Sequence, residues 1–184
     1  MRLQTMVFLG LVGLGACEYS TSPSPLPSDQ FGRVTVIVGG REWVSPIFLD
    51  STVVFFDAAT GRLDILAQSE PSTAQRSLRV SLVATPAVGV YPIGGQGGQG
   101  YALWFEPKPV VRPRTGVSGL RGFLSIGHAS DNLVIEQLDW TAGRIAGSFT
   151  FHAQDPNGGA EQVIHGRFFG RARVISGLPK GWSA

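Results

Sequence analysis

The sequence predicts an all-β fold, a single antiparallel β-sandwich of about ten strands. Short runs in which β-branched or aromatic residues alternate with polar ones recur along the chain, as in Val34, Val36 and Val38. This spacing is typical of half-buried strands. Turn residues separate the runs at intervals of about ten residues, and no run after residue 16 has helical spacing. A closed, calycin-like barrel is the alternative, because it is built from the same kind of strands.

Two hairpins open the predicted domain. Gly39-Gly40 forms the first turn, because glycine takes the positive φ that a two-residue hairpin turn requires. The turn at 58–61 joins the second pair of strands. Pro86 ends a later strand, since proline has no amide hydrogen to donate. The strands predicted in this half are 34–38, 41–44, 52–57, 62–68, 77–84, 89–91 and 101–106.

The second half begins after a long connection. Residues 107–119 contain three prolines and have no periodicity, so they are predicted to lack regular structure. A meander of four strands follows, with turns at 131–132, 141–143 and 157–159. Its strands are 122–127, 133–140, 145–154 and 162–174.

The alternation of inward and outward residues along each strand predicts the faces and the register of the last hairpin. The alternating residues of 145–153 and the partner residues Ile164, Gly166 and Phe168 are expected to face the core. A slip of one residue would expose every phenylalanine, so the two faces are strongly specified. The expected neighbours are Phe149 with Phe168, Phe151 with Gly166, Thr150 with Arg167 and His152 with His165.

The N-terminus carries a short apolar run that ends in small residues and a cysteine. The run spans 6–14 and leads into Leu14-Gly15-Ala16-Cys17. This pattern resembles the lipobox of bacterial lipoproteins, whose signal peptide is removed after acylation of the cysteine. The run is too short to span a membrane, because a spanning helix needs about 20 apolar residues. The resemblance implies that 1–16 are a signal peptide and that Cys17 carries the lipid anchor.

The remaining segments are assigned around this anchor. Residues 17–30 comprise the acylated cysteine and a Ser/Pro-rich tether, a composition that favours extended conformations. Residues 31–175 form the sandwich, and 176–184 form a C-terminal tail. Glu18 follows the cysteine where aspartate often marks inner-membrane retention in such lipoproteins. The resemblance therefore implies the outer membrane, with either its periplasmic or its surface face.

Charge and cysteine content exclude several classes of protein. The chain has 15 Lys and Arg against 13 Asp and Glu, scattered singly along the sequence. No basic stripe is visible, so nucleic acid is not an expected partner. Charged residues are 15% and hydrophobic residues 43% of the chain, which is typical of a folded domain. Cys17 is the only cysteine, so the fold has no internal disulfide.

Histidines are the candidate metal ligands. The predicted register places His152 beside His165, but a zinc site needs three or four protein ligands. No metal or other cofactor is therefore predicted. His128 is expected in an exposed turn before Asp131.

No catalytic motif is present, and the chain is not expected to be an enzyme. Gly95, Gly97 and Gly100 match the letters of a dinucleotide-binding fingerprint, but a strand follows them where that motif requires a helix. Trp43, Trp104 and Trp140 offer flat faces for sugars, although core packing is expected for at least two of them. A hydrolase would need paired carboxylates. The candidates are Glu42, Asp57, Asp64, Glu106, Glu136 and Asp139.

A second resemblance covers most of the predicted domain. Gly40-Arg41-Glu42-Trp43, residues 144–149 and Gly166-Arg167-Phe168 are similar to strand motifs in a group of envelope lipoproteins of unknown function. This resemblance implies no functional residues, because the shared motifs are structural.

The expected function is that of a membrane-anchored envelope lipoprotein acting as a binding or structural module. Its partners would be the membrane, through the lipid, and an envelope protein, a glycan or a small apolar ligand. Two alternatives remain, a lipocalin-like carrier of a small hydrophobic ligand and an unrecognised envelope hydrolase.

Overall fold

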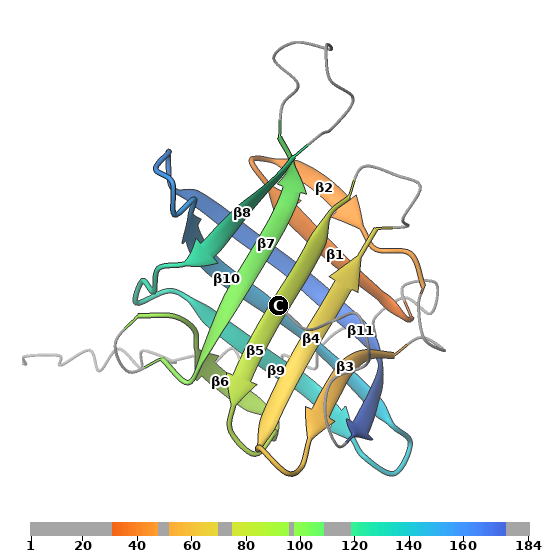
Figure 1. The fold of residues 1–184 in the computed structure, drawn as a ribbon. Helices are drawn as coiled ribbons and strands as arrows, with labels where there is room; N and C mark the ends of the chain where they lie inside the picture. The colour runs from red at the N-terminus through yellow and green to blue at the C-terminus, as the bar shows by residue number, and fades with distance from the viewer. Residues whose placement is uncertain (1–30, 48–51, 70–74, 96–97, 109–118, 176–184) are drawn as a thin grey trace, which may run out of the picture.

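The protein is an all-β sandwich of eleven strands (Figure 1). The computed structural model describes residues 31–47, 52–69, 75–95, 98–108 and 119–175, and none of these residues is helical. The strands are β1 (Arg33–Val38), β2 (Arg41–Val44), β3 (Thr52–Asp57), β4 (Arg62–Gln68), β5 (Ser77–Val83), β6 (Gly89–Pro92), β7 (Gly100–Pro107), β8 (Leu120–Ser125), β9 (Asn132–Asp139), β10 (Arg144–Gln154) and β11 (Gln162–Ile175).

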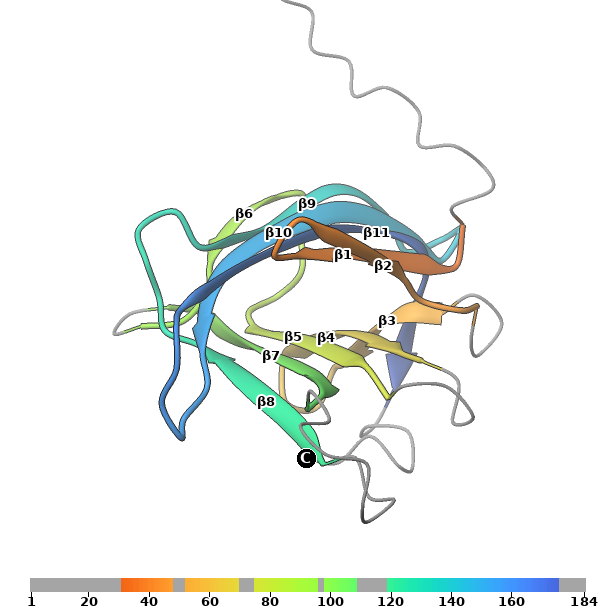
Figure 2. The ribbon, with the colours of Figure 1, turned by 90° about the horizontal axis from the view of Figure 1, so that it is seen from above.

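Two layers face each other, as the sequence predicts (Figure 2). One layer has the order β2-β1-β11-β10-β9-β6 and the other β3-β4-β5-β7-β8. The long strands β10 and β11 join the layers at both sides. β11 pairs with β1 over 164–169 and with β3 over 171–175, whereas β10 reaches β8 only at Ala153 and Gln154.

Large apolar side chains fill the space between the layers. Trp104 of β7, Phe123 of β8 and Phe151 of β10 are each at most 2% exposed. They pack in one cluster with Phe149 and Phe168 and with branched residues from both layers. Full burial of such a side chain stabilises the fold by about 1.5–3 kcal/mol, so each of these aromatics contributes strongly to the packing between the layers.

Both predicted hairpins of the first half are confirmed. β1 pairs with β2, and the turn between them has φ of 55° at Gly39 and 74° at Gly40. β3 pairs with β4 around a turn that ends at Gly61, with φ of 64°. Glycine adopts these positive angles without the steric cost that a Cβ would add.

The predicted meander of the second half is wrong at its first step. β8 pairs with β7 and β10, whereas β9 pairs with β10 and β6. The connection between β8 and β9 therefore crosses from one layer to the other. β11 pairs antiparallel with β1 through its first part and parallel with β3 through its last part.

The last hairpin has the predicted faces but a register shifted by two residues. Phe149 lies opposite Gly166 and Gly147 opposite Phe168, not Phe149 opposite Phe168. The rings of Phe149 and Phe168 thus each lie across a glycine of the partner strand. A Cβ added to Gly166 would lie 2.5 Å from Phe149 Cζ, so the glycines leave the space that the rings occupy. A shift of two keeps every side chain on its face, and parity alone does not detect it.

Candidate functional site

The outward side chains of β11 form a row of charged and aromatic residues. Alternate residues of a strand point to opposite faces, and Ile164, Gly166 and Phe168 face the core. Their neighbours point away from it. The outward row comprises His165, Arg167, Phe169, Arg171 and Arg173.

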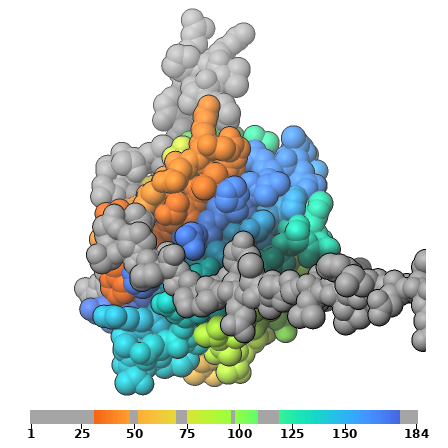
Figure 3. Space-filling view, turned by 180° about the vertical axis from the view of Figure 1, so that it is seen from behind, coloured from red at the N-terminus to blue at the C-terminus, as the bar shows by residue number. Residues whose placement is uncertain are grey.

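Neighbouring strands add two arginines to this row. Arg33 of β1 lies opposite Phe169, and Arg144 of β10 lies opposite Arg171. These strands lie side by side on the face seen in Figure 3. We call the five residues Arg33, Arg144, Arg167, Arg171 and Arg173 the basic strip.

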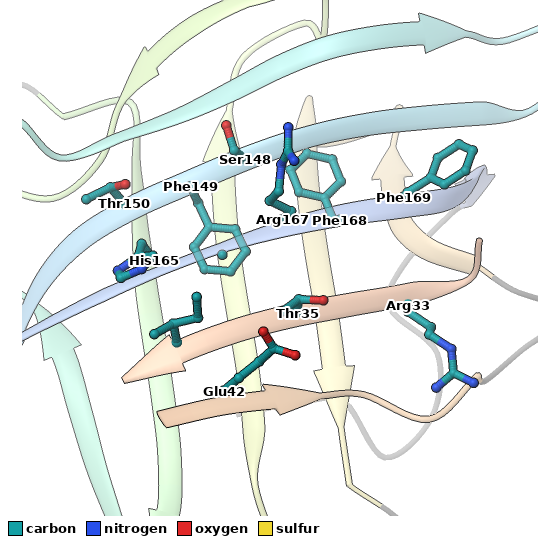
Figure 4. A pocket seen from close by; sticks show the side chains of 12 residues that line it. Arg33, Thr35, Glu42, Ser148, Phe149, Thr150, His165, Arg167, Phe168 and Phe169 are labelled. Carbon is teal, nitrogen blue, oxygen red and sulfur yellow. The ribbon is translucent and has the colours of Figure 1, made fainter. Parts of the chain in front are cut away.

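Two hollows flank the ring contact between Phe31 and Phe169, whose centroids are 5.0 Å apart. The first has a volume of about 510 Å³ and is lined by side chains that include Thr35, Glu42 and Arg167 (Figure 4). The second has a volume of about 500 Å³ and is lined by Trp140 and three arginines. Its arginines are Arg144, Arg171 and Arg173.

The side chains of four arginines of the basic strip form no ion pair or hydrogen bond with the described residues. These are Arg144, Arg167, Arg171 and Arg173, whereas Arg33 donates to the carbonyl of Ser45 at 3.3 Å. By contrast, Arg62 and Arg79 both pair with Asp64. Like charges directly opposite on neighbouring strands are destabilising, and Arg144 and Arg171 are such a pair. None of these four guanidinium groups forms an ion pair with a described carboxylate, although Asp139 lies opposite Arg144 on β9 and Glu42 lines the first hollow.

Two histidines and a glutamate form a second cluster, on the connections at one end of the sandwich. The rings of His128 and His152 stack with centroids 4.1 Å apart and planes 10° apart. His128 Nε2 lies 3.3 Å from Glu161 Oε1. One ring nitrogen of each histidine and a carboxylate oxygen of Glu161 lie within 4.8 Å of one another.

A buried carboxylate orients this cluster. Asp131 Oδ1 lies 2.6 Å from His152 Nδ1, and its Oδ2 accepts from the backbone amides of His128 and His152 at 2.9 and 3.1 Å. The Asp131 side chain is 0% exposed. The contact with Asp131 engages Nδ1 of His152, so Nε2 is the ring nitrogen that Asp131 does not contact.

The predicted pairing of His152 with His165 is wrong. In the observed register His152 lies opposite Val163, and His165 lies opposite Thr150. His165 lines the first hollow instead. The two-residue shift is the cause, because it moves His165 toward the middle of the hairpin.

Most of the candidate carboxylates have separate structural partners. Asp64 is 1% exposed and also accepts from Ser81. Glu42 is exposed beside the first hollow. Asp57 and Asp139 cap turns by accepting from Ala59 and Ala142, Glu106 accepts from Trp104 at 3.4 Å, and Glu136 accepts from Ser148.

The tryptophans divide as expected. Trp104 is buried and Trp43 packs against it, with ring centroids 5.5 Å apart. Trp140 is 40% exposed at the second hollow. The glycine fingerprint fails as expected, since Gly100 begins strand β7.

Sequence reasoning missed the basic strip and the contacts of His128. The strip had a visible signal, because Arg167, Arg171 and Arg173 alternate along one predicted strand. The contact between His128 and Glu161 had no such signal in the sequence. The two residues are 33 positions apart, and they meet because the connection between β8 and β9 lies beside the start of β11.

Cys17 and the tether lie outside the described residues. Within the described ranges, no helix has the length and apolar character needed to cross a membrane. Comparisons with protein-family models, with curated proteins and with solved structures gave no match.

Proposed function

We propose that this protein is a lipid-anchored envelope lipoprotein whose sandwich binds an anionic glycan along the basic strip. The observation that carries the proposal is the set of arginines on one outer face without acidic partners among the described residues. Guanidinium groups bind carboxylate, sulfate and phosphate groups well, because their planar donors match such oxygens.

The dimensions of the strip suit an extended polymer. From His165 to Arg173 the strand covers about 26 Å, at about 3.3 Å per residue. Several sugar units fit along this length. A compact ligand would contact only one of the two hollows, whereas the charges continue through both.

The other side chains on this face favour a sugar polymer. Thr35, Ser148 and Thr150 line the first hollow. The hydroxyl groups of the two threonines can both donate and accept hydrogen bonds, and that of Ser148, which donates to Glu136, can accept. The exposed ring of Trp140 offers an apolar face to a sugar ring at the second hollow.

The packing of the core supports a surface ligand over the lipocalin-like carrier. Trp104, Phe123 and Phe151 occupy the centre of the sandwich, and the two hollows described above lie on its outer face. The proposed anchor at Cys17 complements this role, because it would keep the domain near envelope glycans and away from cytosolic nucleic acid.

Binding of the full chain to heparin, an anionic glycan, tests the proposal. Replacing Arg144 and Arg171 together by Gln should weaken binding by at least about tenfold, since each charge-assisted hydrogen bond contributes about 1.5–3 kcal/mol. The same double variant should be about as stable as the wild type, because it removes the like-charge pair of Arg144 and Arg171 together with the opposite charges of Arg144 and Asp139. Affinity is measured in detergent solution at several salt concentrations, with dextran as the neutral glycan.

A matched control makes the same change in net charge elsewhere. Arg41 lies opposite Val38, whose side chain packs on the core, so Arg41 is not on the outward face that carries the basic strip. Lys108 directly follows β7, which belongs to the other layer. Arg41→Gln with Lys108→Gln should bind heparin like the wild type. Equal binding by the strip variant, or tighter binding of duplex DNA than of heparin, would overturn the proposal.

A further inference from the structure

We propose that His128, His152 and Glu161 form a binding site for a divalent transition-metal ion, with zinc as the metal that fits best. Two imidazoles and one carboxylate are a donor set that binds zinc and leaves a fourth position for water or a ligand. The site lies on connections outside the basic strip, so it is independent of the glycan proposal.

The spacing of the donor atoms agrees with zinc. Bonds of about 2.0–2.2 Å in a tetrahedral site place neighbouring donors about 3.3 Å apart. The distance from His128 Nε2 to Glu161 Oε1 is 3.3 Å. All three donors lie within 4.8 Å of one another. A ring nitrogen binds a metal in the plane of its ring, and the two rings are nearly parallel. Metal binding therefore requires the exposed ring of His128 to tilt toward His152, which Asp131 holds in place.

The contact with Asp131 has the form of the carboxylate–histidine pair that supports metal sites. Such a partner fixes the ring orientation and the tautomer and raises the basicity of the ligating nitrogen. Asp131 is fully buried and holds both the ring of His152 and the backbone of His128. One carboxylate thus positions two of the three ligands.

Exposure decides which kind of metal site this is. The side chains of His128, His152 and Glu161 are 44%, 19% and 39% exposed. Structural zinc sites are closed by four protein ligands, whereas open sites keep a position for exchange. The cluster is therefore suited to reversible binding at the surface and not to holding the fold together.

The ligands come from three separate segments. His128 lies between β8 and β9, His152 lies near the end of β10, and Glu161 directly precedes β11. The backbone amide of Ile126 donates to the carbonyl of His152 at 2.9 Å, which holds the first connection against β10. A bound ion would cross-link these connections and raise the melting temperature.

Equilibrium dialysis of the full chain against Zn²⁺, produced without a polyhistidine tag, tests the site. We expect one ion per chain in the wild type. His128→Ala and Glu161→Gln should each lower the affinity at least about tenfold, because each removes one of three ligands. Both positions are exposed, so the melting temperature without metal should remain that of the wild type.

Two further variants separate a metal site from a structural contact. His165→Ala removes the third histidine of the chain, on another face, and should bind Zn²⁺ like the wild type. Asp131→Asn should lower the affinity by about 10–100-fold through the orientation of His152. The absorption spectrum of bound Co²⁺ should change with His128→Ala and not with His165→Ala. No Zn²⁺ binding by the wild type, or equal binding by wild type, His128→Ala and Glu161→Gln, would overturn the proposal.

Discussion

Asp155 organises the connection between β10 and β11. Its Oδ1 accepts from the backbone amide of Asn157 at 2.8 Å, and its Oδ2 accepts from Arg121 Nε at 3.1 Å. The amide of Asn157 is the main cause that lowers the pKa of Asp155 below its usual value, and Arg121 lowers it further. The carboxylate therefore stabilises the fold in its ionised form.

Arg121→Gln should raise the pKa of Asp155 part of the way back, since the amide of Asn157 remains. A lowered pKa contributes stability that is fully present above the unfolded value and is lost as the pH falls through the folded value. The stability difference that the ion pair causes between wild type and variant should thus begin to shrink below about pH 4 and be lost as the pH falls through the lowered pKa of Asp155. Carboxyl NMR titration measures the pKa.

Asn157→Ala is the control for this titration. It removes only the side-chain amide, a smaller cause than Arg121, so it should raise the pKa of Asp155 less. A larger rise in Asn157→Ala than in Arg121→Gln would contradict this account.

At the level of the strand pair, β10 and β11 are matched by the sizes of their inward side chains. Sequence parity identifies the inward face of both strands, and the burial of Phe149, Phe151 and Phe168 confirms it. Parity does not identify the register. In the observed register the rings of Phe149 and Phe168 each lie opposite a glycine, whereas Phe151 lies opposite Ile164.

Gly166→Ala should therefore destabilise the protein strongly. The added Cβ would overlap the carbonyl of Thr35 and the ring of Phe149, and overpacking of this kind costs about 1–3 kcal/mol or more. Gly89 in β6 is the control, since an added Cβ there meets only Tyr91 at 3.8 Å. Urea unfolding measures both variants. Equal stabilities would show that the glycine opposite Phe149 does not set the register.

The same strand β11 explains why the basic strip was missed. Counted along the chain, the positive charges are single and scattered. An alternating strand turns Arg167, Arg171 and Arg173 to one face, and its neighbours add Arg33 and Arg144. Net charge does not report such an arrangement, because clustering depends on which strands become neighbours.

For the whole molecule, the proposed lipid anchor at Cys17 would decide where both proposed sites act. Lipid chains contribute about 0.8 kcal/mol per buried CH₂, and more than one chain is needed for stable attachment. Cys17→Ser should abolish metabolic labelling by a palmitate analogue and release the protein from the membrane fraction.

Ser20→Ala is the control for labelling, because it changes a neighbouring hydroxyl and leaves the thiol intact. It should label like the wild type. Equal labelling of the Cys17→Ser variant and the wild type would refute the lipid anchor.

The sequence alone determined the all-β class, both early hairpins and the inward faces of the last two strands. Each of these depends on local spacing, since a period of two and the positive φ of glycine act within a few residues. Tertiary structure decided the crossing from β8 to β9, the parallel pairing of β11 with β3, the hairpin register and the meeting of His128 with His152 and Glu161. These depend on which distant side chains fill a shared volume, and no local pattern encodes that choice.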